Sequence, residues 1–222
     1  MKKSICKNFC ILSLFVLGLA LTGCASVSGD GVKSEAQYNV GEFTSISVNG
    51  DFILNIEVNK NIKENSVVIS SEKNIIPLLI PTVKYGVLTI KSSKNIYKTL
   101  PITINIKANS FSELSANGAI KGAFDVDDLN SLTFSSNGVV DFIGKGTVKD
   151  LTIGYHGNSN LDFSELKSQK LAVSGAGVFS AKVYASKSID LTLLGVGNLT
   201  YFGSPSSVTE SNHGLVTITG MK

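Results

Sequence analysis

The chain has 222 residues, 43% of them hydrophobic, and a formal net charge of +3 from 20 basic and 17 acidic side chains. Every basic residue is a lysine, so the sequence contains no arginine. A nearly neutral chain without arginine argues against nucleic-acid binding, which needs side chains that neutralise phosphates. No motif in the chain requires a cofactor, and we expect none.

The first 23 residues have the pattern of a signal peptide. A short basic start, "MKKSICK", precedes an apolar segment from Phe9 to Gly23 that is too short for a membrane-spanning helix. The sequence Leu21-Thr22-Gly23-Cys24 is similar to the bacterial lipobox, in which the cysteine is acylated and becomes the mature N-terminus. We therefore expect a lipid on Cys24 that attaches the protein to the cell envelope, at the outer membrane. The alternative is an ordinary secretory signal with an incidental cysteine.

Cleavage before Cys24 changes the charge and the chemistry of the chain. Lys2, Lys3 and Lys7 are removed with the signal, which leaves 17 lysines against 17 acidic residues. All three cysteines lie at or before position 24. The exported part therefore forms no disulfide and has no cysteine nucleophile or cysteine metal ligand.

The remainder is expected to be one β domain behind a tether. Residues 24–37 are rich in Ser, Gly and Ala and predict a flexible linker. From Tyr38 to the C-terminus, short alternating β-branched segments such as "NSVVIS" and "PITINIK" predict strands. The one helical candidate, "EKNIIPLLIP", is limited to a turn or two by Pro77 and Pro81.

A short sequence motif around a glycine recurs along the chain and predicts the architecture. Apolar pairs such as Leu132 with Phe134 recur together with these glycines, at a period of about 19 to 20 residues. This period predicts an all-β parallel β-helix (a β-solenoid) over residues 38–222, with coils stacked about 4.8 Å apart. Leu132, Leu151, Leu171 and Leu191 are expected to form one inward column. A glycine-rich β-sandwich is the alternative. The expected corner glycines are Gly118, Gly138, Gly157, Gly175, Gly195 and Gly214.

On these motifs the chain resembles the auto-transporter adhesin head, or GIN-domain, family of exported bacterial proteins. The family's opening strand is matched by Phe43, Ile46, Val48 and Gly50. Its corner motif is matched most closely by Ser174-Gly175-Ala176-Gly177, and its closing motif by Tyr201-Phe202-Gly203-Ser204-Pro205. The resemblance covers roughly residues 40 to 220 and implies a right-handed parallel β-helix. It brings no established catalytic residues.

Catalytic and metal sites are weakly indicated. His156 and His213 are three coils apart, about 14 Å, so one metal ion cannot join them. A glycan-cleaving enzyme would need clustered carboxylates. Asp141 and Asp162 occupy the same position within the repeat and could therefore stack on one face of the coils. A solvated surface without a catalytic role explains both residues equally well. The carboxylate candidates are Asp125, Asp127, Asp128, Asp141 and Asp162.

The outward face is the expected recognition surface. Thr133, Thr152 and Thr192 face outward on the repeated strands, and Tyr155 and Tyr184 could stack on a sugar ring. A solvated sheet without a ligand is the competing interpretation. We expect a noncatalytic envelope lipoprotein that recognises a glycan or an envelope protein, and a homo-oligomer is left open. The alternatives are a glycan-active enzyme and a structural assembly component.

Overall fold

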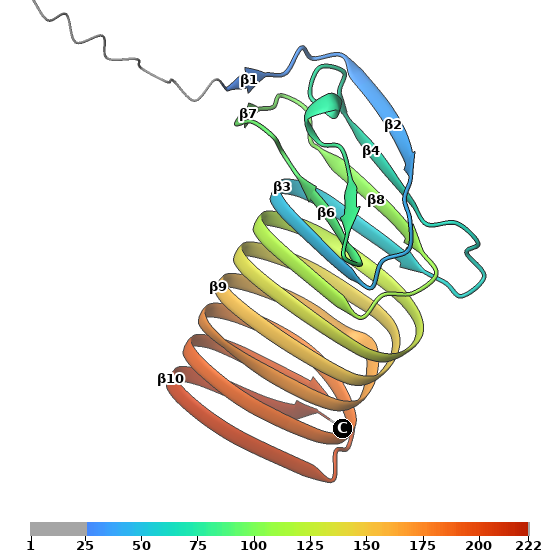
Figure 1. Cartoon of the computed structure of the whole chain (residues 1–222). Coiled ribbons are helices and arrows are strands. Elements are labelled where there is room, and N and C mark those ends of the chain that lie inside the picture. Colours follow the sequence, from blue (N-terminus) through green and yellow to red (C-terminus); the bar gives the residue numbers. More distant parts are fainter. Residues whose placement is uncertain (1–25, 222) are drawn as a thin grey trace, which may run out of the picture.

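The computed structural model describes residues 26–221, and the expected signal peptide and Cys24 lie outside this range. The described chain is all-β apart from one three-residue 3-10 helix. Short strands gather at the N-terminal end, and below them the chain winds in stacked coils to the C-terminus (Figure 1). Within residues 26–221 no helix is long and apolar enough to cross a membrane.

The main sheet follows the order β10-β9-β3-β8-β4-β2. Strand β3 runs parallel to β6, β8 and β9, and β10 runs parallel to β9, whereas β4 is antiparallel to both β2 and β8. The elements are β1 (Val27–Ser28), β2 (Lys33–Asn39), β3 (Ser45–Val58), β4 (Ser66–Glu72), η1 (Ile76–Leu78), β5 (Thr82–Lys84), β6 (Val87–Lys91), β7 (Ile96–Tyr97), β8 (Thr103–Ala108), β9 (Glu113–Phe202) and β10 (Ser207–Met221).

Successive coils pair in parallel at a nearly constant offset. Strand β10 pairs with the end of β9 at 19 residues, so that Gly214 lies beside Gly195. Strand β3 pairs with the start of β9 at 68 residues, so that Gly50 lies beside Gly118. The larger offset arises because the segment from β4 to β8 is inserted between β3 and β9, and within it β8 and β4 continue the main sheet beyond β3 (Figure 1).

The corner glycines stack so closely that no side chain fits between coils. A Cβ atom on Gly138, for example, would come well within 3.0 Å of the Gly118 carbonyl oxygen. The predicted corner at Gly175 is wrong, because Gly177 has the positive φ of 136° and stacks on Gly157. The observed column is Gly50, Gly118, Gly138, Gly157, Gly177, Gly195 and Gly214.

The correction at Gly177 shifts the register of the following coil. From Gly157 to Gly177 the step is 20 residues, and from Gly177 to Gly195 it is 18. Leu171 therefore lies beside Ile189, and Leu191 lies beside Val173 instead of continuing the predicted leucine column. The bond from the Ser186 hydroxyl to the Ser168 carbonyl oxygen, also 18 residues apart, agrees with this register. All these leucine positions are nevertheless buried.

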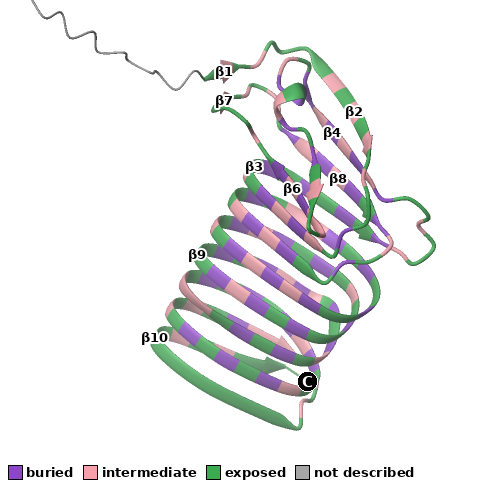
Figure 2. Ribbon diagram, in the orientation of Figure 1, coloured by how far each residue is buried: buried purple, intermediate pink, exposed green. Residues whose placement is uncertain are grey.

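Inward side chains fill the space between the walls of each coil. Buried and exposed residues alternate along the ribbon, as a strand with one solvated face requires (Figure 2). Phe124, Phe134, Phe142 and Phe163 form an aromatic cluster with ring centroids 5.2 to 6.4 Å apart. Each such buried side chain contributes about 1.5–3 kcal/mol relative to an exposed one. Most of the stability therefore comes from this continuous apolar interior.

The predicted flexible tether is also corrected where the structure describes it. Residues 27–28 form β1, which pairs with β7, and β2 begins at Lys33 and pairs with β4. Asn74 fastens the turn between these strands, because its amide donates to the Ser28 carbonyl at 2.7 Å. Composition could not reveal this order, since the partner residues lie 27 to 69 positions further along the chain.

The buried side chain of Glu72 also holds the segment between β1 and β2 in place. Its side chain is fully enclosed, and its carboxylate accepts hydrogen bonds from the Gly31 and Leu100 backbone amides and from both the amide and the hydroxyl of Thr99. Gly29 has no side chain where the carboxylate lies, since a Cβ there would overlap it. The Thr99 hydroxyl, followed by the backbone amides, lowers the pKa of Glu72 against the opposing effect of burial.

We predict that Gly177→Ala destabilises the protein by about 3 kcal/mol or more, because the added methyl meets the neighbouring backbone and the positive φ disfavours an L side chain. That loss corresponds to a melting temperature about 6–12 °C lower. Gly154→Ala is the matched control, because its Cβ would meet only the Ser135 hydroxyl at 3.8 Å. Equal melting temperatures for the two variants would contradict the corner assignment.

We predict that Glu72→Gln lowers the free energy of unfolding at pH 7, because the amide cannot accept the four hydrogen bonds as a carboxylate does. The folded-state pKa lies below the unfolded value of about 4.3, so this contribution is complete above that value and is lost as the pH falls through the folded pKa. Urea unfolding at pH 7 and pH 3 measures it, with exposed Glu64→Gln as control. A parent–variant difference that does not shrink at pH 3 contradicts the assignment.

Candidate binding surface

The outward side chains form rows that run across the coils. Four ion pairs join residues 20 positions apart, at nitrogen–oxygen distances of 3.3 to 3.6 Å. All eight side chains are well exposed, so each pair contributes at most about 1 kcal/mol. The ion pairs are useful here because they show which residues of neighbouring coils lie side by side. The pairs are Lys121–Asp141, Lys145–Glu165, Lys170–Asp150 and Lys182–Asp162.

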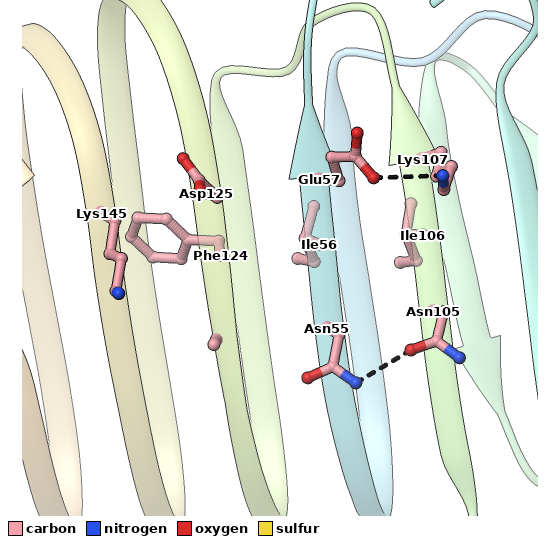
Figure 3. Close-up of a pocket in the computed structure, with 10 residues that line it drawn as sticks. Asn55, Ile56, Glu57, Asn105, Ile106, Lys107, Phe124, Asp125 and Lys145 are labelled. Carbon is pink, nitrogen blue, oxygen red and sulfur yellow. Dashed lines mark hydrogen bonds and ion pairs between the residues drawn. The ribbon is translucent and has the colours of Figure 1, made fainter.

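Six of the ten residues that line one outward hollow are polar, and we call it the polar groove. It lies over β8, β3 and the first coils of β9 and has a volume of about 430 Å³ (Figure 3). Ala123 lies in register with Asn55, and its short side chain leaves the space open. The outward residues of the polar groove are Asn55, Glu57, Asn105, Lys107, Ala123, Asp125 and Lys145.

Hydrogen bonds and ion pairs hold one wall of the polar groove in place. The Asn55 amide donates to the Asn105 carboxamide oxygen at 2.9 Å, and Lys107 lies 3.2 Å from Glu57 (Figure 3). The pairing leaves the Asn55 carboxamide oxygen free to accept and the Asn105 amide free to donate. Asp125 lies beside Glu57 in the sheet. Two lysines and two carboxylates make the groove electrically neutral, which suits a ligand rich in hydroxyl groups.

A second hollow, without Lys, Asp or Glu in its lining, lies on the other arm of the coils, and we call it the glycine hollow. It has a volume of about 440 Å³ and opens where Gly154 interrupts an outward row of hydroxyl-bearing residues. Ser135, Ser174 and Thr192 continue that row. Thr192 therefore does not lie in the row of Thr133 and Thr152, because the 18-residue step displaces it by two positions.

Tyr155 is not available as a stacking surface. Its side chain is 2% exposed and packs on Phe179, with ring centroids 5.0 Å apart. Burial raises the pKa of Tyr155 to about 12. Gly175, which was expected at the corner, leaves the space that the Tyr155 ring occupies. The alternation of inward and outward residues places Tyr155 two positions before corner Gly157, on the inward side.

Tyr184 and the remaining predicted threonines lie at or near the surface. Tyr184 is half-buried, and the Lys167 ammonium lies 4.1 Å from its ring centroid, which occupies one face of the ring. Thr152 is exposed and Thr133 is partly exposed. The structure thus does not bring Tyr184 together with the threonines in either hollow.

The carboxylate pair considered for catalysis is not stacked. Asp141 lies beside Asn160, whose amide donates to it at 3.0 Å, and Asp162 lies two positions further along the next coil. Partial burial raises the pKa of Asp162, but hydrogen bonds from Ser164 and the Lys182 ammonium outweigh burial and lower it overall. Asp162 is therefore ionised at neutral pH, which does not suit a general acid.

The other titratable candidates lie apart. Asp128 forms an ion pair with Lys60 at 3.0 Å, and this hydrogen bond and the positive charge lower its pKa. Both histidines are exposed beside the corner, and His156 borders the glycine hollow. Residues 26–221 contain no group of three or more His, Cys, Asp or Glu side chains placed to hold one metal ion.

Sequence reasoning missed most of the polar groove. It singled out Asp125 but not Asn55, Glu57, Asn105 or Lys145. The segment "FTSISVNGDF" is similar to "FSELSANGAI", with Gly50 at the position of Gly118, and extending this similarity would have placed Asn55 beside Ala123. The position of β8 beside β3 had no such signal, because β8 lies outside the repeat.

Solved structures with a similar fold come from Bacteroides and Parabacteroides species. One, described as a putative adhesin from Bacteroides fragilis, is 20% identical, with a TM-score of 0.66 over 88% of this chain and all of that one. A putative lipid binding protein from Parabacteroides distasonis is 17% identical, with a TM-score of 0.55 over 89% of this chain and all of that one. A putative adhesin from Parabacteroides merdae is 16% identical, with a TM-score of 0.51 over 89% and 99% of the two chains.

These identities show a shared fold and no more. No curated protein matches the chain. The family model described as "Putative auto-transporter adhesin, head GIN domain" matches residues 42–205, which begin just before β3 and end just before β10. That match covers well over half of the sequence and includes the corner glycines up to Gly195. The chain therefore belongs to the auto-transporter adhesin head GIN-domain family, as the sequence motifs indicated.

Proposed function

We propose that the protein is a noncatalytic adhesion module of the bacterial cell envelope that binds a neutral glycan in the polar groove. The single observation that carries the proposal is the prearranged wall of Asn55, Asn105, Glu57 and Lys107 above the short side chain of Ala123. A row of donors and acceptors already held in place loses little freedom when sugar hydroxyls bind. Membership of a family named for adhesins supports the same role.

The proposal includes the architecture that displays the groove. A right-handed parallel β-helix accounts for parallel pairing at a 19-residue offset and for the stacked corner glycines. Connections between parallel neighbouring strands are right-handed in almost all proteins, which favours that hand here. Such a stack is rigid along its length, so its outward rows present a fixed pattern to a long polymer.

The proposed location is the outer membrane, with Cys24 as the lipid anchor. The described chain begins at Ser26, only two residues after Cys24. Strand β1 and the Glu72 hydrogen bonds fix the start of the domain, so a lipid on Cys24 would hold the N-terminal end of the stack close to the bilayer. The polar groove would then lie on the side of the stack, accessible to extended polymers.

We predict that Ala123→Leu abolishes glycan binding, because the larger side chain fills the polar groove without removing a polar group. Asn55→Ala should weaken binding about three- to tenfold, the usual effect of losing one hydrogen bond. A glycan array probed with the chain from Ser26 onward, followed by titration of the best ligand, measures both. Ala172→Leu is the matched control, because Ala172 is exposed in an outward row away from the groove.

Two outcomes would contradict the groove proposal. Glycan binding that survives Ala123→Leu unchanged would place the site elsewhere. Cleavage of a polysaccharide by the parent, lost in Asp141→Asn/Asp162→Asn while the melting temperature is kept, would favour the glycan-active enzyme instead.

We predict that Cys24→Ser removes the protein from the membrane fraction or leaves it as unprocessed precursor, because serine cannot accept the thioether-linked lipid. Fractionation of cells that express the full chain, with metabolic labelling by a radioactive fatty acid, measures this. Ser26→Ala is the control. A cleaved Cys24→Ser protein that stays in the membrane fraction would show that no lipid on Cys24 is needed.

A further inference from the structure

The two edges of the main sheet are protected very differently. Strand β2 forms one edge, has seven residues and carries Lys33 and Glu35. Charges and short length are the usual devices that keep an edge strand from pairing with another chain. Strand β10 forms the other edge and has 15 residues, which pair only with β9.

Strand β10 leaves both backbone and apolar groups uncovered. It contains no lysine and no proline, and its one carboxylate is Glu210. Leu215 is 77% exposed and Met221 48% exposed, and the inward Val216 and Ile218 are only partly covered. Figure 2 shows most of the last coil as exposed, in contrast to the coils above it. Nothing in the described chain, residues 26–221, lies over this end of the stack.

The last coil is symmetric about its corner. Seven residues of β10 precede Gly214 and seven follow it. We propose that β10 pairs with β10 of a second copy of this chain, in antiparallel register about a twofold axis through Gly214. In that register all 15 residues find a partner, corner lies on corner, and the interstrand distance of about 4.8 Å continues across the junction.

The side chains match this register. Thr209 lies opposite Thr219 of the second copy, and exposed Leu215 lies opposite His213. Inward residues meet inward residues, because the register preserves the alternation along the strand. The partly covered Ile218 is then enclosed by the second copy. Paired backbone groups and a closed apolar interior are what the terminal coil lacks in a single chain.

The size of the contact indicates a weak, reversible dimer. Two arms of seven residues, each about 23 Å long and about 10 Å apart, give a total buried area of roughly 900 Å². Transient complexes have such areas, whereas stable ones bury more. Glu210 weakens the contact further, because it occupies the inward column of Leu191 and would lie opposite Ile218 of the second copy.

The dimer places the proposed glycan sites apart. The polar groove lies over β8, β3 and the first coils, at the other end of the stack from β10 (Figure 1). Two chains joined at β10 would carry one groove near each outer end. A long polymer that spans both grooves would be held more tightly than one groove alone can hold it. This consequence rests on the proposed function, but the dimer itself does not.

Sedimentation velocity of the chain from Ser26 onward, over a wide concentration range, tests the proposal. We expect reversible dimerisation, tightened about tenfold or more by Glu210→Gln, because a buried charge is removed. Ile218→Lys should abolish the dimer, and Ile143→Lys, an exposed position in the middle of the stack, should not. A monomer at concentrations on the order of 1 mM, or a dimer that Ile218→Lys leaves intact, would overturn the proposal.

Engineered cysteines test the register, since the native chain has none after Cys24. Outward Ser211 is expected opposite Thr217 of the second copy. A mixture of Ser211→Cys and Thr217→Cys chains should therefore form a mixed disulfide under mild oxidation, and neither variant alone should form one as quickly. Equal cross-linking in all three samples would contradict the twofold axis through Gly214. Pairing of β10 with a different protein would leave the purified chain monomeric.

Discussion

The close stacking of backbone on glycine at each corner is the contact on which the rest of the molecule depends. A carbonyl oxygen of one coil lies where the next coil would place a Cβ atom, as at Gly157 and Gly177. Only glycine allows this approach together with a positive φ. Because the corners are locked one above another, every other residue of a coil has a fixed neighbour. The inward columns and the outward rows both follow from that alignment.

The sequence predicted the period and the all-β class because a glycine column and alternating apolar residues are local patterns. It failed where the period varied. The phrase around Gly175 and Gly177 offers two glycines, and only the fit of the Tyr155 ring against Gly175 decides between them. The same ambiguity misplaced Leu191 and Thr192 by two positions. The order of residues 27–39 was hidden because it depends on distant strands and on Glu72.

The two surface hollows have one physical origin. In a stack of coils, outward side chains form even rows, so a flat face results unless one member of a row is short. Ala123 interrupts one row and Gly154 another, and a hollow opens over each. The two differ in chemistry because their neighbours differ: charged and amide groups surround Ala123, and hydroxyl groups surround Gly154. A small substitution in an outward row can therefore create or remove a binding site while the core stays unchanged.

The two ends of the stack differ in how they are held. In a repeating stack each coil is stabilised mainly by its neighbours, so a terminal coil has half the contacts of an internal one. The N-terminal end compensates with additional strands that continue the sheet beyond β3 and with the enclosed carboxylate of Glu72. The C-terminal coil has no such additional strands within the described residues, and its inward positions include Glu210 and Asn212, which lie beside Leu191 and Leu193 of the preceding coil. This coil is therefore expected to open first as the protein unfolds, and the order of unfolding should run from β10 toward β3.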